Sequence, residues 1–478
     1  MGHVPPGDGG AGFVPGPVVG DDLVMPIATI NPATGETERV FEPDSDDEVE
    51  SKLAAAARAA TTFRTVPVGD RARLASSAAD LLEGELPDIA RLLTLEMGKT
   101  FAAAKGEVAK CAMALRWFAE RAPAMLVSEV VSPSAPRRVV RYDPMGPVLA
   151  VMPWNFPMWQ VTRFAAPALM VGNVGLLKHA SNVPQTALLI ADVFRRAGYP
   201  DGAFQTLLVG SDRVAGLIED DRVRAVTLTG SEAAGRSVAE VAGRALKKSV
   251  LELGGSDPFV VLPSADLDRA VTVGVEARVQ NNGQSCIAAK RFIVHGAVYD
   301  EFAARFTDAM DGLVVGDPMD PATDVGPLAT AQGRADVAEQ VDDARAHGVE
   351  VLCGGRGVDG PGFFYAPTVL AGIAAPMRVA HEEVFGPVAL LLRAEDAADA
   401  LRQANDTGFG LGASVWTSDP AEQELFVGGL EAGMVFVNAM VASTPELPFG
   451  GTKRSGYGRE LALQGLREFC EIKSVSVA

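Results

Sequence analysis

Three side chains of this sequence combine a reactive or polar group with surroundings that can present it to a ligand. Cys286 follows a loop of Gly, Asn, Gln and Ser residues in QNNGQSCIAAK, which can expose its sulfur. A cysteine thiolate is a strong nucleophile. Glu252 precedes a Gly-Gly turn in VLELGGSDP, and Asn155 lies between two prolines in MPWNFP. Each residue also has a structural explanation: a buried small side chain, a strand-end surface charge and a hydrogen-bonded core amide.

Alternating strands and helices would position these residues. GPVLAVMP, VGLLKHA, AFQTLLVG and VRAVTLTGS are typical of strands, and helical segments such as PQTALLIADVFRRAG separate them. A second series begins near SDPFVVLP and includes KRFIVHGAVYDEFAARFTDAM. Strands that alternate with helices of this length predict βαβ units and parallel sheets. We therefore expect an α/β fold with two α/β domains and a small β appendage.

The segments outside the two α/β series predict helices in the N-terminal part of the chain, and strands between Met125 and Tyr142 and at the C-terminus. The pattern is helical from about Asp44 to Arg121, and GEVAKCAMALRWFAERA predicts a helix that ends before Pro123. The Val-rich stretch from Met125 to Tyr142 predicts extended hairpin arms. The terminal REFCEIKSVSVA alternates like an edge strand, which stays exposed unless something pairs with it.

Composition limits the class of protein. The chain has 478 residues, of which 48% are apolar and 22% charged, so it is globular and long enough for two or three domains. The formal net charge of −19, without a Lys/Arg run, argues against nucleic acid as a partner. The five histidines are scattered and form no HExxH motif, so we expect no metal. Four separate cysteines without a CxxC pair fit a reducing compartment, and we expect structural roles for Cys111, Cys353 and Cys470.

Targeting and membrane segments are not expected. Residues 1–24 are rich in Gly and Pro and lack an apolar core with basic flanks, which predicts a disordered tail rather than a signal peptide. Translation could begin at Met25. The most apolar stretch, Pro147 to Leu177, is interrupted by three prolines and contains several polar residues, so it predicts a strand, loop and helix of a core. We expect a cytoplasmic protein.

Six motifs in order resemble one family. MPWNFP, LTGS, LELGGSDP, NNGQSC, EEVFGP and PFGGTKRSGYGRE, at these separations, are similar to the aldehyde dehydrogenase superfamily over everything after about Ile27. The segments LLKHASNVPQ, VLELGGSDPF and VQNNGQSCIAAKRF most resemble bacterial members that oxidise succinate semialdehyde. The resemblance implies a Rossmann-like dinucleotide-binding domain, an α/β catalytic domain, a small β oligomerisation domain and a homodimer or homotetramer. The implied boundaries are a tail over 1–24, nucleotide binding over 25–122 and 142–253, catalysis over 254–459, and oligomerisation over 123–141 and 460–478.

The resemblance also implies a mechanism. Cys286 would attack the aldehyde carbon as a thiolate, while the Asn155 amide and the Cys286 backbone N–H hold the developing oxyanion. Hydride transfer to the cofactor would leave a thioester, and Glu252 would activate the water that hydrolyses it.

For the cofactor, the resemblance implies that the strand-to-helix turn at Gly230 and Ser231 faces the pyrophosphate. Glu383 and Phe385 would contact the nicotinamide ribose, Lys178 would lie near the adenosine ribose, and Trp154 would line the cofactor or pack in the core. Ser181 stands where NAD-preferring relatives often carry Glu, so a 2′-phosphate is not repelled there. We expect NADP, with NAD possible.

For the substrate, the resemblance implies that Arg163 binds a carboxylate tail and that Ser443 assists. The second arginine of many relatives is replaced by Gln280, and Arg278 stands two residues earlier. Glutarate semialdehyde and aromatic aldehydes therefore remain alternatives, as does a purely structural salt bridge of Arg163.

Three other functions stay open as alternatives. The chain could transfer the acyl group to CoA, act as a simple thiol esterase, or be a non-catalytic structural homologue. Glu252 favours hydrolysis over CoA transfer. Ala288 stands where some relatives carry a second cysteine, so no local disulfide switch is expected at Cys286.

Overall fold

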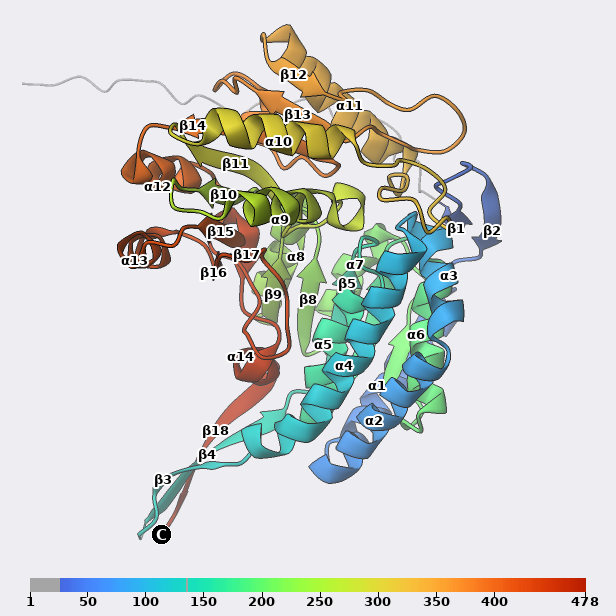
Figure 1. Cartoon of the computed structure of the whole chain (residues 1–478). Coiled ribbons are helices and arrows are strands. Elements are labelled where there is room, and N and C mark those ends of the chain that lie inside the picture. The colour runs from blue at the N-terminus through green and yellow to red at the C-terminus, as the bar shows by residue number, and fades with distance from the viewer. Residues whose placement is uncertain (1–25, 135) are drawn as a thin grey trace, which may run out of the picture.

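The computed structural model describes residues 26–134 and 136–478 (Figure 1). The expected tail over 1–24 and the alternative start at Met25 lie outside the described residues. The first elements of the described chain are a short antiparallel pair of strands, β1 (Ile27–Ile30) and β2 (Thr37–Phe41). The architecture that follows is two larger sheets, a helical layer and a three-stranded arm.

Four helices form the N-terminal layer: α1 (Asp46–Phe63), α2 (Val68–Gly84), α3 (Leu86–Met97) and α4 (Phe101–Met125). Ser45 begins α1 with a capping box, in which its hydroxyl and the Glu48 carboxylate satisfy each other's backbone amides. The expected end of the last helix before Pro123 is wrong, because α4 continues to Met125 with Pro123 in its final turn. A proline this close to a helix end costs one backbone hydrogen bond, and the N–H of Leu126 still reaches the carbonyl of Ala122.

The first large sheet has six strands in the order β17-β9-β8-β5-β6-β7. All are parallel except β17, which joins from a segment expected in the catalytic domain. Helix α5 (Trp159–Val171) is buried along its whole length between this sheet and α4, so Pro147 to Leu177 does fold as strand, loop and helix. The strands are β5 (Pro147–Met152), β6 (Val174–His179), β7 (Phe204–Thr206), β8 (Ala225–Thr229), β9 (Lys248–Glu252) and β17 (Gly456–Tyr457), and the other helices are α6 (Pro184–Arg196), α7 (Val214–Glu219) and α8 (Glu232–Arg244).

The second large sheet has seven strands in the order β12-β13-β14-β11-β10-β15-β16, and only β12 is antiparallel to its neighbour. Its strands are β10 (Asp257–Val261), β11 (Ala289–His295), β12 (Glu350–Cys353), β13 (Thr368–Ala371), β14 (Val388–Ala394), β15 (Gly412–Trp416) and β16 (Met434–Val437). The accompanying helices are α9 (Leu267–Val279), α10 (Tyr299–Asp311), α11 (Ala331–Ala346), α12 (Ala397–Asn405) and α13 (Pro420–Gly429). The predicted alternation of strands and helices is thus confirmed in both sheets.

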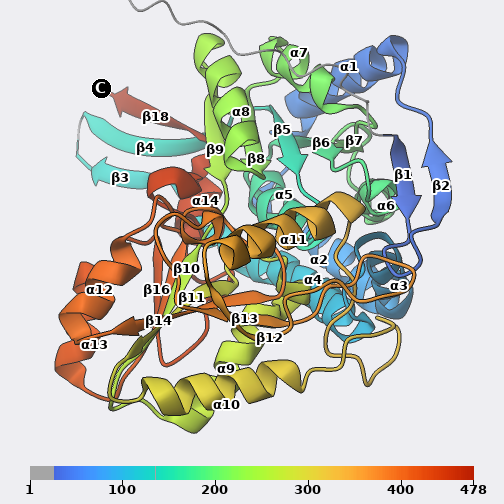
Figure 2. The same ribbon diagram turned by 90° about the horizontal axis from the view of Figure 1, so that it is seen from above.

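The third part is a twisted arm that extends from the body and carries the C-terminus (Figures 1 and 2). In it, β4 (Arg137–Pro144) lies between β3 (Glu129–Ser132) and β18 (Cys470–Val477), which follows α14 (Ala462–Glu468). Every residue of β18 is paired with one of β4. The Val-rich hairpin and the terminal strand expected from the sequence therefore form one sheet, although more than 300 positions separate them along the chain.

The observed architecture confirms the expected α/β fold class. Among residues 26–134 and 136–478, no helix combines the length and apolarity that crossing a bilayer requires.

Candidate active site

The carboxyl ends of the parallel strands in the first sheet bring most of the predicted residues to one edge. Lys178 lies at the end of β6, Glu252 ends β9, and Gly230 follows β8. Trp154 and Asn155 stand in the loop after β5. Since parallel strands end at the same edge of their sheet, residues as far apart in the chain as Asn155 and Glu252 meet there, where open α/β sheets bind their ligands.

The chain crosses from the first sheet to the second directly beside Cys286. Only four residues separate Glu252, which ends β9, from Asp257, which begins β10. Among them is Gly255, where a Cβ atom would lie 2.7 Å from the carbonyl oxygen of Cys286. A side chain at this position would push the two segments apart. The LGG sequence therefore permits the close approach of the Glu252 segment and the Cys286 loop.

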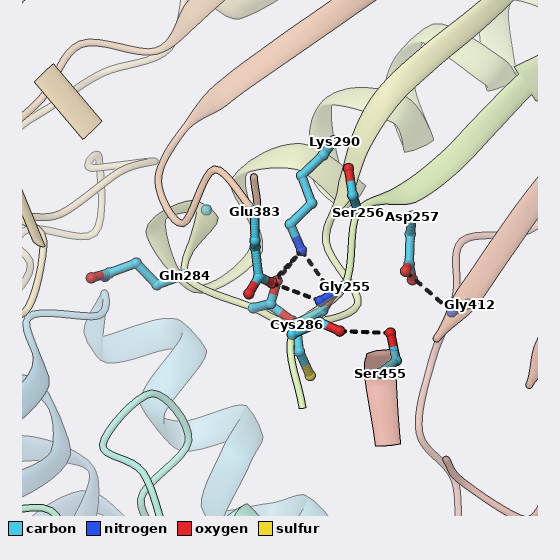
Figure 3. Close-up of polar contacts among 12 residues, drawn as sticks. Gly255, Ser256, Asp257, Gln284, Cys286, Lys290, Glu383, Gly412 and Ser455 are labelled. Atoms are coloured by element: carbon cyan, nitrogen blue, oxygen red, sulfur yellow. Dashed lines mark hydrogen bonds and ion pairs between the residues drawn. The ribbon is translucent and has the colours of Figure 1, made fainter. Parts of the chain in front are cut away.

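Lys290 holds the Cys286 loop through its backbone carbonyls (Figure 3). This lysine is fully buried on β11, and its Nζ donates to the carbonyl oxygens of Ser285 at 2.8 Å and Cys286 at 2.7 Å. It also forms an ion pair with Oε1 of Glu383 at 3.1 Å, and that oxygen accepts from the Gly255 N–H at 3.1 Å. The sulfur of Cys286 points away from this cluster (Figure 3). Sequence reasoning missed Lys290, although it stands only four residues after Cys286 in CIAAK.

Burial keeps Cys286 protonated. It raises the pKa of the thiol to about 12, and the negative charges of Glu383 and Asp257 act in the same direction. The positive charges of Arg163 and Lys290 oppose the rise. A thiol with such a pKa needs a base to become a nucleophile at neutral pH.

Asn155 lies against the same loop. Its Nδ2 donates to the carbonyl oxygen of Gln284 at 3.2 Å, two residues before the cysteine, and its Oδ1 accepts from Gln160 at 3.3 Å. Asn281 then closes the contact by donating to the backbone oxygen of Asn155 at 2.7 Å. Asn281 and Asn282 both have left-handed backbone angles, with φ of 57° and 58°. Asparagine tolerates this conformation better than most residues, which explains the NN pair in QNNGQSC.

Glu252 is buried with neither carboxylate oxygen hydrogen-bonded to any described residue. Burial raises its pKa well above the ordinary glutamate value, and the neighbouring carboxylate of Glu460 raises it further. Arg163 and Arg459 partly oppose this rise. A carboxyl group with a raised pKa is suited to general acid–base work. Sequence reasoning missed Glu460. It stands at the end of SGYGRE, and nothing in that segment indicates that its carboxylate lies next to Glu252.

Arg163 adopts the alternative arrangement that the sequence left open. Its Nε is paired with Glu460 Oε2 at 2.7 Å, and its guanidinium lies over the ring of Phe449 at 4.2 Å. Both side chains of the ion pair are buried. Arg278 is buried as well, and donates to the carbonyl of Gly283 at 2.7 Å.

Ser443 lies beside a cation that sequence reasoning did not single out. Its Oγ accepts from Trp159 Nε1 at 2.8 Å and from Lys110 Nζ at 3.0 Å. Lys110 is half-buried on α4, one helical turn after the buried Glu107. In the sequence, only its position three residues after Glu107 in a predicted helix could have indicated that Lys110 lies on a buried face.

The residues expected to bind the cofactor lie at the start of α8 and at the end of β6. Ser231 caps α8 by accepting from the Ala234 N–H, and the N–H of Gly230 donates to the Glu252 carbonyl at 3.0 Å. Burial lowers the pKa of Lys178, with the charge of Asp212 opposing. In the described part of the chain, no carboxylate lies within ion-pairing distance of the Lys178 ammonium. A buried cation without an ionic partner fits a phosphorylated ribose.

The remaining predicted residues lie near this edge or near Cys286. Ser181 stands in the turn between β6 and α6, and its carbonyl accepts from the Ala28 N–H. Trp154 and Phe385 pack edge to face, with ring centres 5.8 Å apart. Phe385 precedes β14, which is parallel to β11. The expected aromatic and polar lining therefore comes from both sheets.

The cysteines other than Cys286 lie in apolar settings. All four are free thiols, and Cys111 and Cys470 are buried. Burial raises the pKa of Cys353 to about 11 and that of Cys470 to about 12. Across the described ranges, His, Cys, Asp and Glu side chains nowhere gather in the groups of three that a metal site needs.

Comparison with known proteins agrees with this geometry. The succinate-semialdehyde dehydrogenase [NADP(+)] 1 of Mycobacterium tuberculosis (strain ATCC 25618 / H37Rv) is 58% identical over 457 residues, covering 95% of this chain and 100% of the relative. The succinate-semialdehyde dehydrogenase [NADP(+)] of Mycobacterium avium (strain 104) is 58% identical over 455 residues, covering 94% and 96%. The crystal structure of the succinic semialdehyde dehydrogenase of Streptococcus pyogenes in complex with NADP+ superposes with a TM-score of 0.92 at 37% identity, covering 94% of this chain and 99% of that one.

The family pattern itself spans nearly the whole chain. The sequence pattern of the aldehyde dehydrogenase family matches residues 19–475, which include every site residue discussed above. Together with the two relatives, this match shows that the chain belongs to the aldehyde dehydrogenase family.

Proposed function

We propose that this enzyme oxidises succinate semialdehyde to succinate with NADP as the hydride acceptor. The observation that carries the proposal is the cysteine loop of the family, held by Lys290 and Asn155 beside a buried glutamate whose carboxylate oxygens have no hydrogen-bond partner in the described chain. The substrate and cofactor follow from relatives of this name that are 58% identical over nearly the full chain.

In the first half-reaction, Cys286 attacks the aldehyde carbon and forms a thiohemiacetal. Glu252 takes the thiol proton, since burial keeps that thiol protonated at neutral pH. The Asn155 Nδ2 and the Cys286 backbone N–H stabilise the oxyanion, and one such donor contributes about 10²–10³ in rate. Bound NADP would supply the hydride acceptor for the thiohemiacetal carbon, and Cys286 would then carry the acyl group as a thioester.

Before the second half-reaction, Glu252 releases the thiol proton to solvent. It then removes a proton from the attacking water, and as the C–S bond breaks it returns this proton to the Cys286 sulfur, which leaves as the thiol. Its raised pKa makes Glu252 a stronger base than an exposed carboxylate. This base supports hydrolysis, whereas transfer to CoA would not require it.

The cofactor preference is assigned to Lys178 and Ser181. Lys178 supplies a positive charge for the 2′-phosphate, and Ser181 adds no negative charge that would repel it. Gly230, Ser231 and the N-terminus of α8 would hold the pyrophosphate. Trp154, Glu383 and Phe385 would line the nicotinamide ribose.

The direct test is formation of reduced nicotinamide with succinate semialdehyde, using NADP and NAD in parallel. We expect turnover that favours NADP and is abolished in C286A. Turnover only with other aldehydes would overturn the substrate, and no turnover with any aldehyde would favour a non-catalytic homologue. Thioester hydrolysis without either cofactor would instead identify a thiol esterase.

The Ser181 assignment has its own test in S181E. A carboxylate at this position would repel the 2′-phosphate and accept bonds from the ribose hydroxyls of NAD. We expect kcat/KM for NADP to fall at least tenfold while that for NAD is unchanged or rises. An unchanged NADP preference would contradict the assignment.

The proposal extends to assembly and location. We propose a cytoplasmic homodimer or homotetramer in which 123–141 and 460–478 form the oligomerisation part, 25–122 and 142–253 bind the nucleotide, and 254–459 carry catalysis. Support comes from the arm, whose edge strands β3 and β18 lack outer neighbours within the described chain.

A further inference from the structure

Lys110 is a cation beside the candidate substrate residues. Its Nζ is 3.0 Å from the Ser443 hydroxyl oxygen and 4.3 Å from the centre of the Trp159 ring. Trp159 and Ser443 are themselves buried, at 3% and 4% exposed. Trp159 begins α5 one turn before Arg163, in the helix that follows Asn155. Lys110 therefore reaches the same region as the residues expected to bind the substrate.

The carboxylates of Glu107 and Glu460 are already paired with other cations. Glu107 is paired with Lys99, and its Oε1 also accepts from the backbone N–H groups of Met158 and Trp159, both at 2.9 Å. Glu460 is paired with Arg163. Within residues 26–134 and 136–478, no carboxylate oxygen lies within 4.0 Å of the Lys110 ammonium. A half-buried ammonium with only a hydroxyl and a ring as partners is incompletely compensated.

Ser443 is left with an unused donor. A hydroxyl has two acceptor lone pairs and one proton. Trp159 and Lys110 both donate to its oxygen, so both lone pairs are occupied. No acceptor for the Ser443 proton exists among the described residues. The Ser443 proton therefore has no acceptor and the Lys110 ammonium has no anionic partner in the described chain, and a carboxylate is the group that satisfies both.

Arg163 is a poorer candidate for the same ligand. Its guanidinium is neutralised by Glu460 at 2.7 Å and covered by Phe449. Its remaining contact, at 3.4 Å, is with the Thr229 hydroxyl. Freeing it for a substrate carboxylate would leave the buried Glu460 without its cation, which is costly. Lys110 needs no such rearrangement.

We propose that Lys110, with the Ser443 hydroxyl, binds the carboxylate at the far end of the aldehyde and sets the preference for ω-carboxylated substrates. This inference rests on the proposed function, since it explains how the carboxylate of succinate semialdehyde is recognised. The positive charge of Arg163 then acts on the Cys286 thiol and on Glu460 rather than on the substrate tail.

The test compares succinate semialdehyde with butanal, which has the same four-carbon chain without the carboxylate. In K110M we expect kcat/KM for succinate semialdehyde to fall about 10- to 100-fold, mainly through KM, because a charge-assisted hydrogen bond is lost. Butanal should change by less than about twofold, because it never used the charge. K110R should recover much of the loss. K105M, which removes an exposed lysine from the same helix, is the matched control and should behave as wild type.

Each outcome separates the two proposals. If kcat/KM of K110M falls by the same factor with both aldehydes, or falls with neither, Lys110 does not bind the carboxylate. If the wild-type enzyme itself shows no preference for succinate semialdehyde over butanal, the proposed function fails first and this inference fails with it. Inhibition by succinate gives a second measurement: its inhibition constant should rise at least tenfold in K110M, and an unchanged constant would overturn the inference.

Discussion

Glu252 combines burial with a neighbouring carboxylate, and this combination produces its raised pKa. We expect E252Q to lower steady-state turnover by about 10²–10⁴, the usual contribution of a general base. If its main task is the hydrolytic step, the succinyl thioester should accumulate on Cys286, which intact-mass analysis of the quenched enzyme would detect. E471Q, an exposed glutamate on β18, is the control. Lost turnover without acyl-enzyme would place Glu252 in the first step alone, and wild-type turnover would exclude it from both.

Lys110 should give the enzyme a pH-dependent affinity for charged substrates. Burial and the charge of Arg163 together lower its pKa to about 8, while Cys111, Glu107 and Cys286 act in the opposite direction. The ammonium is lost as pH rises through this value, so kcat/KM for succinate semialdehyde should fall above about pH 8. An arginine stays charged there, so K110R should lack this fall. Identical pH profiles of the two enzymes would contradict the prediction.

At the scale of elements, Lys290 joins the start of β11 to the loop before β14. It satisfies two backbone carbonyls of the Cys286 loop and the carboxylate of Glu383. In K290M we expect unfolding to become easier by about 2–5 kcal/mol, because buried acceptors lose their donor. Urea denaturation measures this, with K248M, a more exposed lysine on β9, as the control.

The same variant should also change catalysis in a specific way. Since Lys290 contacts the backbone of the nucleophile and not its sulfur, we expect kcat to fall more than tenfold with little change in KM for the aldehyde. Equal unfolding free energies and an unchanged kcat would show that the loop holds its shape without this lysine.

At the scale of the whole molecule, the arm is too thin to bury its own apolar residues. Val131 and Ile472 are 67% and 68% exposed on its two edge strands. We expect a V131E/I472E double variant to dissociate, because charges on a buried strand edge would be desolvated without partners. Sedimentation velocity would show a smaller species than wild type. V40E, at an exposed valine on β2, is the control, and an unchanged sedimentation coefficient would argue against assembly through the arm.

Several features of this protein were decided by its sequence alone. The alternation of strands and helices could be predicted because period and residue type act locally, within one element. The roles expected for Cys286, Glu252 and Asn155 could be proposed because six motifs in order resemble one family, whereas each residue alone also had a structural explanation. The end of α4 was placed too early because Pro123 lies in its last turn, where the expected break costs only one hydrogen bond.

Other features were decided only by the tertiary structure. Arg163 and Glu460 lie almost 300 positions apart, and Lys110 and Ser443 are separated by 333. Neither pair leaves a local pattern, since a lone Lys or Arg in a helix has the same sequence context whether it binds a substrate or a carboxylate of the protein. Which cation is neutralised and which stays available depends on how α4, α5 and the C-terminal loops pack. Electrostatic pairing is a property of distances between side chains, and only the folded chain sets those distances.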